Sequence, residues 1–274
     1  MGWAHGDIPH MRLYVRRANL FRTILGPSFI AGLALSVIAL FLLAEPHDAL
    51  VKADVIGFAT CHRIPERSLH VDGHQLPLCA RCTGIYIGML TGWLWLIVRR
   101  RTHAAQLPAR PIVVALAGFI ALMGIDGLNS TAMLIGLPHP YETENWMRVL
   151  TGSLYGLALS LLVTPFVTVT LWREPTGERT LKGWGELLLL VNVTAIIVMV
   201  ALTGASFLLW PLVTVSVAGV VGLMALMNLS IVTTLAGQAN TFAGWRDWLA
   251  PGLVGVSLAL VEFTGIGLLR VGIV

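Results

Sequence analysis

All three cysteines of the chain lie in one short window that also holds several histidines. The candidate ligands of this window are Cys61, His62, His70, His74, Cys79 and Cys82. Thiolate and imidazole are the usual protein ligands of zinc. A Cys-x-x-Cys pair presents two thiols from one turn, so a third cysteine and one histidine would complete a tetrahedral shell. We predict that the three cysteines and one of the three histidines bind zinc or another transition metal.

Two other chemistries are open to the same cysteines. Cys79 and Cys82 would also suit a redox pair that exchanges with a quinone or a partner protein. A structural disulfide within that pair, or from Cys61 to either member, would leave an odd thiol. A helix that begins near Cys79 would favour the thiolate through its free N–H groups, and Arg81 would add to this. We rank metal binding first, redox exchange second and a structural disulfide third.

A second polar group recurs at helical spacing further along the chain. Asp126, Asn129 and Ser130 stand at i, i+3 and i+4, and Asn145 and Arg148 at i and i+3. Ionisable residues inside a membrane span are costly and usually face a partner or a water-filled cavity. We expect Asp126 to pair with Arg148. The pair would either lock two spans together or form the floor of a pocket.

In the pocket interpretation these residues divide the work of catalysis and binding. Arg148 would hold a phosphate or carboxylate, and Asp126 would act as acid or base. The expected substrate-binding residues are Asn129, Asn145, Arg148 and, in the outer half of the last apolar run, Glu262.

Composition places the whole chain in a membrane. Hydrophobic residues make up 56% of the chain and charged residues 12%, whereas a soluble domain has about half apolar and a quarter charged residues. Too little polar surface remains to cover a water-soluble globule, so the natural solvent is lipid. The net charge of +4 comes from basic residues beside apolar runs. Such residues anchor to headgroups, and we expect no nucleic-acid partner.

Seven apolar runs are long enough to span a bilayer, at about 20 residues each. They are residues 24–44, 80–98, 111–129, 147–172, 184–204, 207–236 and 248–270. None alternates like a barrel strand, so we predict an all-α, polytopic transmembrane helix bundle. Residues 24–274 would form a single domain after a tail at residues 1–23.

The distribution of Lys and Arg predicts the orientation of this bundle. With the N-terminus inside, the inner segments carry most of the 18 Lys and Arg residues, which favours N-in and C-out in the inner (plasma) membrane. Residues 1–23 would be a retained cytoplasmic tail rather than a cleaved signal peptide. The loop at residues 45–80, with its Cys/His window, would then be extracytoplasmic, on the same side as Asp126 and Arg148.

The second apolar run has a small-residue face. Gly84, Gly88 and Gly92 repeat every four residues. This spacing is typical of close packing between membrane helices. We expect another span to approach the Cys/His window along this face.

Four strings in the first part of the chain resemble a known family. They read CHRIPERS at 61–68, GHQLPLCARCTGIY at 73–86, DGLN at 126–129 and NWMRVLTG at 145–152. Together they resemble a family of prokaryotic integral-membrane proteins catalogued as a domain of unknown function. The resemblance covers roughly residues 55–160. It implies that these motifs belong together, and it supplies no activity.

We therefore expect an integral-membrane metalloprotein with its metal beside a polar intramembrane pocket. An open metal position would serve hydrolysis or group transfer on a lipid-linked or amphipathic substrate. A metal with four protein ligands would have only a structural role, holding the loop at residues 45–80 against the second span. The alternatives are a transporter or lipid-handling protein, a quinone-linked thiol–disulfide oxidoreductase, and an accessory subunit of a membrane complex. Expected partners are the lipid bilayer, a lipid or amphipathic small molecule, and a second copy or a membrane-complex partner.

Overall fold

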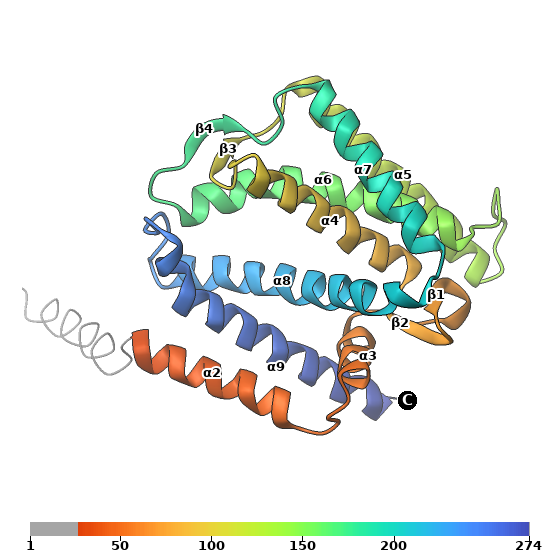
Figure 1. Cartoon of the computed structure of the whole chain (residues 1–274), viewed down its shortest axis with the longest axis horizontal. Coiled ribbons are helices and arrows are strands. Elements are labelled where there is room, and N and C mark those ends of the chain that lie inside the picture. Colours follow the sequence, from red (N-terminus) through yellow and green to blue (C-terminus); the bar gives the residue numbers. More distant parts are fainter. Residues whose placement is uncertain (1–26, 274) are drawn as a thin grey trace, which may run out of the picture.

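The computed structural model describes residues 27–273, which are mostly helical (Figure 1). Six helices in this range are long and apolar enough to cross a membrane. They are α4 (Ala80–Val98), α5 (Arg110–Leu134), α6 (Asn145–Leu171), α7 (Trp184–Leu202), α8 (Leu209–Leu235) and α9 (Leu249–Ile273). These six confirm the second to seventh predicted runs as helices.

The first predicted run is only partly within the described residues. Its described part is helix α2 (Pro27–Leu43), which has 17 residues. The predicted tail at residues 1–23 lies outside the described residues.

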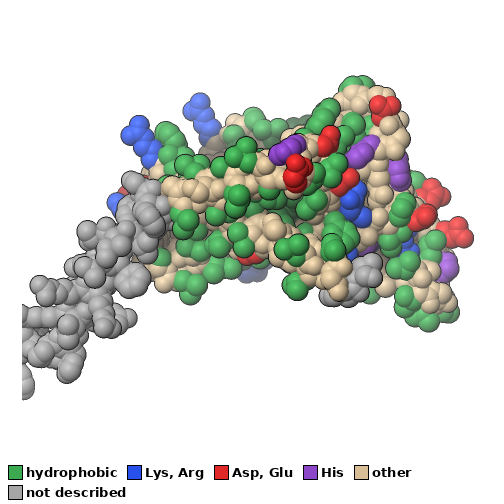
Figure 2. All heavy atoms as spheres, turned by 90° about the horizontal axis from the view of Figure 1, so that it is seen from below, with side chains coloured by type: hydrophobic (Ala, Val, Ile, Leu, Met, Phe, Trp, Pro, Cys, Tyr) green, Lys and Arg blue, Asp and Glu red, His purple; other side chains and the backbone are tan. Residues whose placement is uncertain are grey.

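The long helices turn apolar side chains outward, as a lipid solvent requires. On α5, for example, Leu128 is 75% exposed and Val114 is 71% exposed. Figure 2 shows hydrophobic side chains spread along the body of the molecule, with His, Asp and Glu gathered toward one end. An outward apolar surface of this kind fits hydrocarbon rather than water. The protein is a multi-pass membrane protein.

Helices α4 and α6 form the tightest helix pair. A Cβ atom on Gly84 or Gly88 of α4 would run into the backbone of α6, and one on Gly152 or Gly156 of α6 would run into the backbone of α4. Without side chains at these positions the two backbones can approach closely. The predicted small-residue face is confirmed, and its partner is α6.

The remaining helices form two flanks around this pair. Helices α5 and α7 pack beside α4 and α6, while α8 packs on α9 and α9 packs on α2. Contacts between α4 and α8 join the two groups. Figure 1 shows α4 and α8 close together near β2 and further apart toward β3 and β4.

The segment at 45–80 is folded rather than a simple loop. It contains α3 (Ala49–Thr60), the 3-10 helix η1 (Pro65–Arg67), and the antiparallel strands β1 (Ser68–Val71) and β2 (His74–Cys79). Asp72 and Gly73 join these strands with φ of 54° and 75°. Two positive φ values are typical of a type I′ hairpin turn. The Asp-Gly pair was a sequence signal for this hairpin that we did not use.

A second small sheet lies at the opposite end of the molecule. Strands β3 (Ala104–Gln106) and β4 (Thr176–Arg179) pair in parallel between the ends of α4 and α6. The fold class is therefore mostly helical with two small sheets, rather than purely helical as predicted. Short strands outside the apolar runs carry little periodic signal, which is why the pattern missed them.

Candidate metal centre

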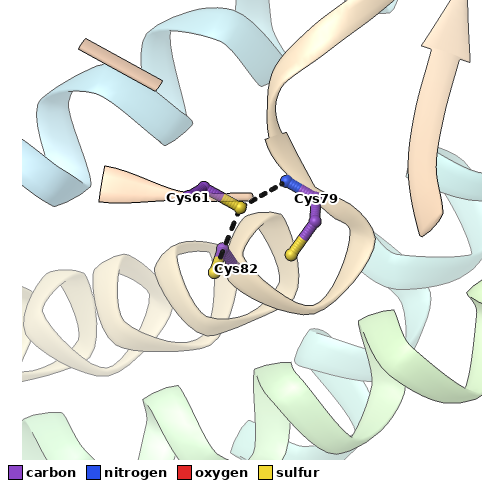
Figure 3. Close-up of side chains that lie close together, drawn as sticks. All are labelled: Cys61, Cys79 and Cys82. Atoms are coloured by element: carbon purple, nitrogen blue, oxygen red, sulfur yellow. Dashed lines mark hydrogen bonds between the residues drawn. The ribbon is translucent and has the colours of Figure 1, made fainter. Parts of the chain in front are cut away.

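The three cysteines converge on one point (Figure 3). Their sulfur atoms all lie within 4.8 Å of one another, and the Sγ atoms of Cys61 and Cys82 are 4.0 Å apart. Sulfurs around a tetrahedral zinc with bonds of about 2.3 Å lie about 3.8 Å apart. All three cysteines are free thiols. Their spacing therefore fits one metal ion with little movement of the chain.

Each cysteine is positioned by the end of a structural element. Cys61 follows α3, and its N–H donates to the carbonyl of Gly57 at 2.8 Å. Cys79 ends β2 and is the N-cap of α4, and Cys82 lies in the first turn of α4. The predicted helix start near Cys79 is confirmed. The dipole and free N–H groups of this helix start favour a negative sulfur.

Close backbone packing brings α3 to the cysteines of α4. A Cβ atom on Gly57 would overlap the backbone of Pro77 in β2. Glycine at this position therefore lets α3 lie against the strand that carries Cys79. The side chain of Asp48 accepts from the N–H groups of Leu50 and Val51 at 2.8 and 3.0 Å, which caps the other end of α3.

The sulfur cluster is buried, and its hydrogen bonds favour negative charge on Cys61. Cys61 is 5% exposed and Cys79 is 4% exposed. The backbone N–H of Cys79 donates to the Sγ of Cys61 at 3.3 Å. Hydrogen bonding with the Cys79 and Cys82 side chains lowers the pKa of Cys61 well below its usual range. The hydrogen bond to Cys61, together with burial, raises the pKa of Cys79. These hydrogen bonds favour negative charge on Cys61 over Cys79.

The three histidines of the window lie outside the sulfur cluster. Within residues 27–273 the group of possible ligand atoms holds cysteines alone. The Nδ1 of His62 accepts from the N–H of Ile64 at 3.0 Å, and the Nε2 of His74 lies 3.7 Å from a carboxylate oxygen of Asp54. His70 pairs with Gln75 across the hairpin. The histidine ligand stays a prediction.

The second polar group adjoins the cysteines, with a different ion pair from the predicted one. The Oδ2 of Asp126 lies 2.5 Å from Arg81 Nη2, not from Arg148. Arg148 donates to the Oδ1 of Asn145 at 2.8 Å and to the Oγ of Ser130 at 3.4 Å. Helices α4 and α5 both pack on α6, and Arg81, the residue before Cys82, reaches Asp126 across this arrangement.

Two asparagines tie this group to the surrounding chain. The Nδ2 of Asn129 donates to the carbonyl of Tyr141 at 2.8 Å and to the Oγ1 of Thr143 at 3.0 Å. The Nδ2 of Asn145 donates to the carbonyls of Glu66 and Ser68 at 3.2 and 3.3 Å, in the Cys/His segment. The juxtaposition of the two polar groups, expected from the sequence, is therefore present.

Two hydroxyl groups missed by the sequence analysis also face Asp126. The hydroxyl of Tyr141 donates to its Oδ1, and that of Thr151 donates to its Oδ2, both at 3.4 Å. Burial and the charge of Asp126 raise the pKa of Tyr141. Thr151 stands three residues after Arg148, a helical spacing that could have identified it.

Several buried polar atoms of this group have no partner among the described residues. They are the Nε atoms of Arg81 and Arg148 and the Oδ1 of Asn129. Arg148 is 5% exposed and Asp126 is 3% exposed. A buried polar atom without a partner costs about 1–3 kcal/mol, so such atoms usually contact water or a ligand. Two guanidinium groups with spare donors suit an anionic oxygen.

Glu262 lies on a different pair of helices. Its Oε2 accepts from the Nδ2 of Asn228 at 3.1 Å, which links α9 to α8. No hydrogen bond within the described part of the chain connects Glu262 to Asp126. Its predicted role in substrate binding is not supported by this contact and stays a prediction.

Comparison with known proteins identifies relatives for this part of the chain. Residues 61–162 match the family described as predicted membrane protein DUF2085. An uncharacterized protein of Methanocaldococcus jannaschii is 30% identical over 115 residues, 42% of this chain and 67% of its own length. Another, from Methanothermobacter thermautotrophicus, is 37% identical over 106 residues, 37% of this chain and 82% of its own length.

The solved structures add no relative, since none gives a significant match to this chain. The matched residues include the three cysteines, Asp126 and Arg148. On the family match and the two relatives, this chain belongs to the DUF2085 family of predicted membrane proteins.

Proposed function

We propose that this protein is a membrane metalloenzyme whose metal is held by Cys61, Cys79 and Cys82. The observation that carries the proposal is the convergence of three sulfur atoms within 4.8 Å at the start of α4. The first turn of α4 also supplies Arg81 to the buried polar group. A site for a metal and a site for an anion are therefore adjacent in one helical turn.

The residues around this site support group transfer or hydrolysis. A metal with three protein ligands and an open position supplies Lewis-acid chemistry toward a carbonyl or phosphoryl oxygen. Arg148 and Arg81 would hold the phosphate or carboxylate of the substrate through their spare N–H groups. Asp126, which is paired with Arg81, would accept a proton. One of His62, His70 and His74 would complete the metal shell if the site is purely structural.

A lipid-linked or amphipathic substrate suits the location of the site. The site lies at the ends of the apolar helices α4, α5 and α6 rather than in a soluble domain. A substrate with its polar group at that level would keep its apolar part beside the outward Leu and Val side chains. In the proposed N-in, C-out orientation, the site faces the extracytoplasmic side.

Metal content of the purified protein tests the proposal. We expect a stoichiometric transition metal, and loss of most of it in Cys79→Ser, because a hydroxyl is a poor replacement for thiolate. Thr60→Ala is a matched control at the end of α3, since this hydroxyl bonds only within its own helix. A metal-free wild-type protein with three freely alkylated thiols would falsify the proposal.

A second candidate function is supported by the sulfur distance itself. Cys61 and Cys82, at 4.0 Å, are close enough to form a disulfide after a small movement. A quinone-linked thiol–disulfide oxidoreductase would use this pair rather than the predicted Cys79 and Cys82. It requires a reversible disulfide, measured by thiol trapping across a series of redox buffers. Thiols that stay reduced in every buffer would exclude it.

A further inference from the structure

A large apolar cavity lies far from the cysteines, toward the end of the molecule that carries β3 and β4. Its volume is about 660 Å³, and it opens between the α4 and α6 pair and the α8 and α9 pair. In Figure 1 the ribbons of α4 and α8 diverge in this region. Ligand cavities of about 300–1,000 Å³ are typical of sites for small amphiphiles.

Aromatic residues line and adjoin this cavity. Trp172 and Trp248 both line it, with ring centroids 6.0 Å apart. The ring of His103 stacks on Trp172 at 3.8 Å. The Nε1 of Trp248 is buried and has no acceptor among the described residues.

Arginines adjoin the lining residues on this side. Arg100 stands two residues before the lining residue Thr102, and Arg173 follows the lining residue Trp172; both arginines are exposed. Hydrogen bonds from the N–H groups of Ala243 and Gly244, together with the charge of Arg173, lower the pKa of Asp247. Arg173 also donates to the carbonyl of Thr241 at 3.4 Å, which leaves its other N–H groups for a ligand. Basic residues beside an apolar pocket between membrane helices are the usual recognition elements for anionic lipid headgroups.

We infer that this cavity binds an acyl chain of an anionic phospholipid, with the phosphate held by Arg100 and Arg173. The apolar lining accounts for the chain, and the arginines account for the charge. A neutral quinone would use the same apolar volume but would gain nothing from the arginines. This site is independent of the proposed metal.

Two glycines allow the cavity to be filled without disturbing the helices. Gly222 of α8 and Gly252 of α9 both line it, and a Cβ atom on either would meet no atom within 4 Å. Leucine at these positions would project into open space. Gly118→Leu on α5 is the matched control, since Gly118 is equally open but is not among the lining residues.

Native mass spectrometry of the purified full chain with added phosphatidylglycerol measures the binding. We expect Gly222→Leu and Gly252→Leu to lose the bound lipid and Gly118→Leu to keep it. Arg100→Gln and Arg173→Gln should each weaken phosphatidylglycerol binding about fivefold, because a basic residue near the headgroup contributes about that factor. Phosphatidylethanolamine, bound weakly, should be unaffected by either arginine substitution.

Three results would overturn the inference. The first is equal phosphatidylglycerol binding by Gly222→Leu and Gly118→Leu, which would place the lipid elsewhere. The second is equal binding of phosphatidylethanolamine and phosphatidylglycerol by the wild type. The third is a neutral quinone that displaces phosphatidylglycerol and binds more tightly. Far-UV circular dichroism and metal content of the same variants show whether they are folded and whether the cysteine site is intact.

Discussion

Within residues 27–273, Arg101 and Glu186 form an ion pair at one end of the molecule and Arg81 and Asp126 form one at the other, and the two pairs differ in how completely they are bonded. At the end with β3 and β4, Arg101 donates to both carboxylate oxygens of Glu186, at 2.7 and 2.9 Å. Arg101 also donates to the carbonyl of Thr180 at 3.4 Å, and the N–H of Lys182 donates to Glu186 at 2.8 Å. Neither side chain has an unpartnered buried atom within the described residues.

The pair at the cysteine end is less complete. Arg81 contacts Asp126 through one nitrogen, and its Nε has no partner in the described chain. The nearby Arg148 adds a second guanidinium with a spare donor. An ion pair whose donors and acceptors are all bonded is typical of a structural contact. Buried donors without a partner are typical of a site that binds water or a ligand. The complete bonding of Arg101 and Glu186 thus fits a structural role, and the incomplete bonding of Arg81 and Asp126 fits a functional one.

The largest effect is expected from breaking the complete pair. Arg101→Ala leaves the partly buried carboxylate of Glu186 without its main partner, and we expect the free energy of unfolding to fall by up to about 3–5 kcal/mol. Thermal unfolding in detergent measures this loss. The metal content of the fraction that remains folded should be unchanged. If Arg101→Ala lost the metal but kept its stability, the pair of Arg101 and Glu186 would have the functional role and not the structural one.

A smaller effect on stability, with a clear effect on binding, is expected at the other end. Arg148→Met removes a buried cation that lies near other arginines. The free energy of unfolding should therefore change by no more than about 1 kcal/mol. Inorganic phosphate should raise the unfolding temperature of the wild type, because a ligand of the folded state stabilises it. It should not raise that of Arg148→Met. Equal stabilisation of both proteins by phosphate would contradict an anion site at Arg148.

The smallest effects are expected from the histidines. His62→Ala, His70→Ala and His74→Ala should each keep nearly full metal content, since the sulfur cluster holds no histidine in the described structure. The metal would then have an open fourth position, as the proposed chemistry requires. If one variant alone loses the metal, that histidine is the fourth ligand and the site is closed.

The sequence predicted what depends on composition and local spacing. Long apolar runs are sufficient to place six helices, because lipid leaves a hydrophobic chain few alternatives. The glycine repeat predicted a close helix contact, and the clustered cysteines predicted their convergence. Each of these features is contained within one or two neighbouring segments of the chain.

What the sequence could not supply depends on how one helix is rotated against another. The spacing along the chain favoured Arg148 as the partner of Asp126, whereas the folded helices bring Arg81 to it. The direction of the histidines depends on the hairpin, whose Asp72 and Gly73 turn could have been recognised from the Asp-Gly pair. Helix α3 also had a local signal, the cap at Asp48.

Arg81 and Cys82 are consecutive residues in the first turn of α4, and this turn is packed against Gly152 of α6. A ligand that shifts one of these side chains through the backbone must also shift the other. In the proposed site, metal and anion occupancy would therefore be linked. If the metal tightens anion binding by some factor, the anion must tighten metal binding by the same factor.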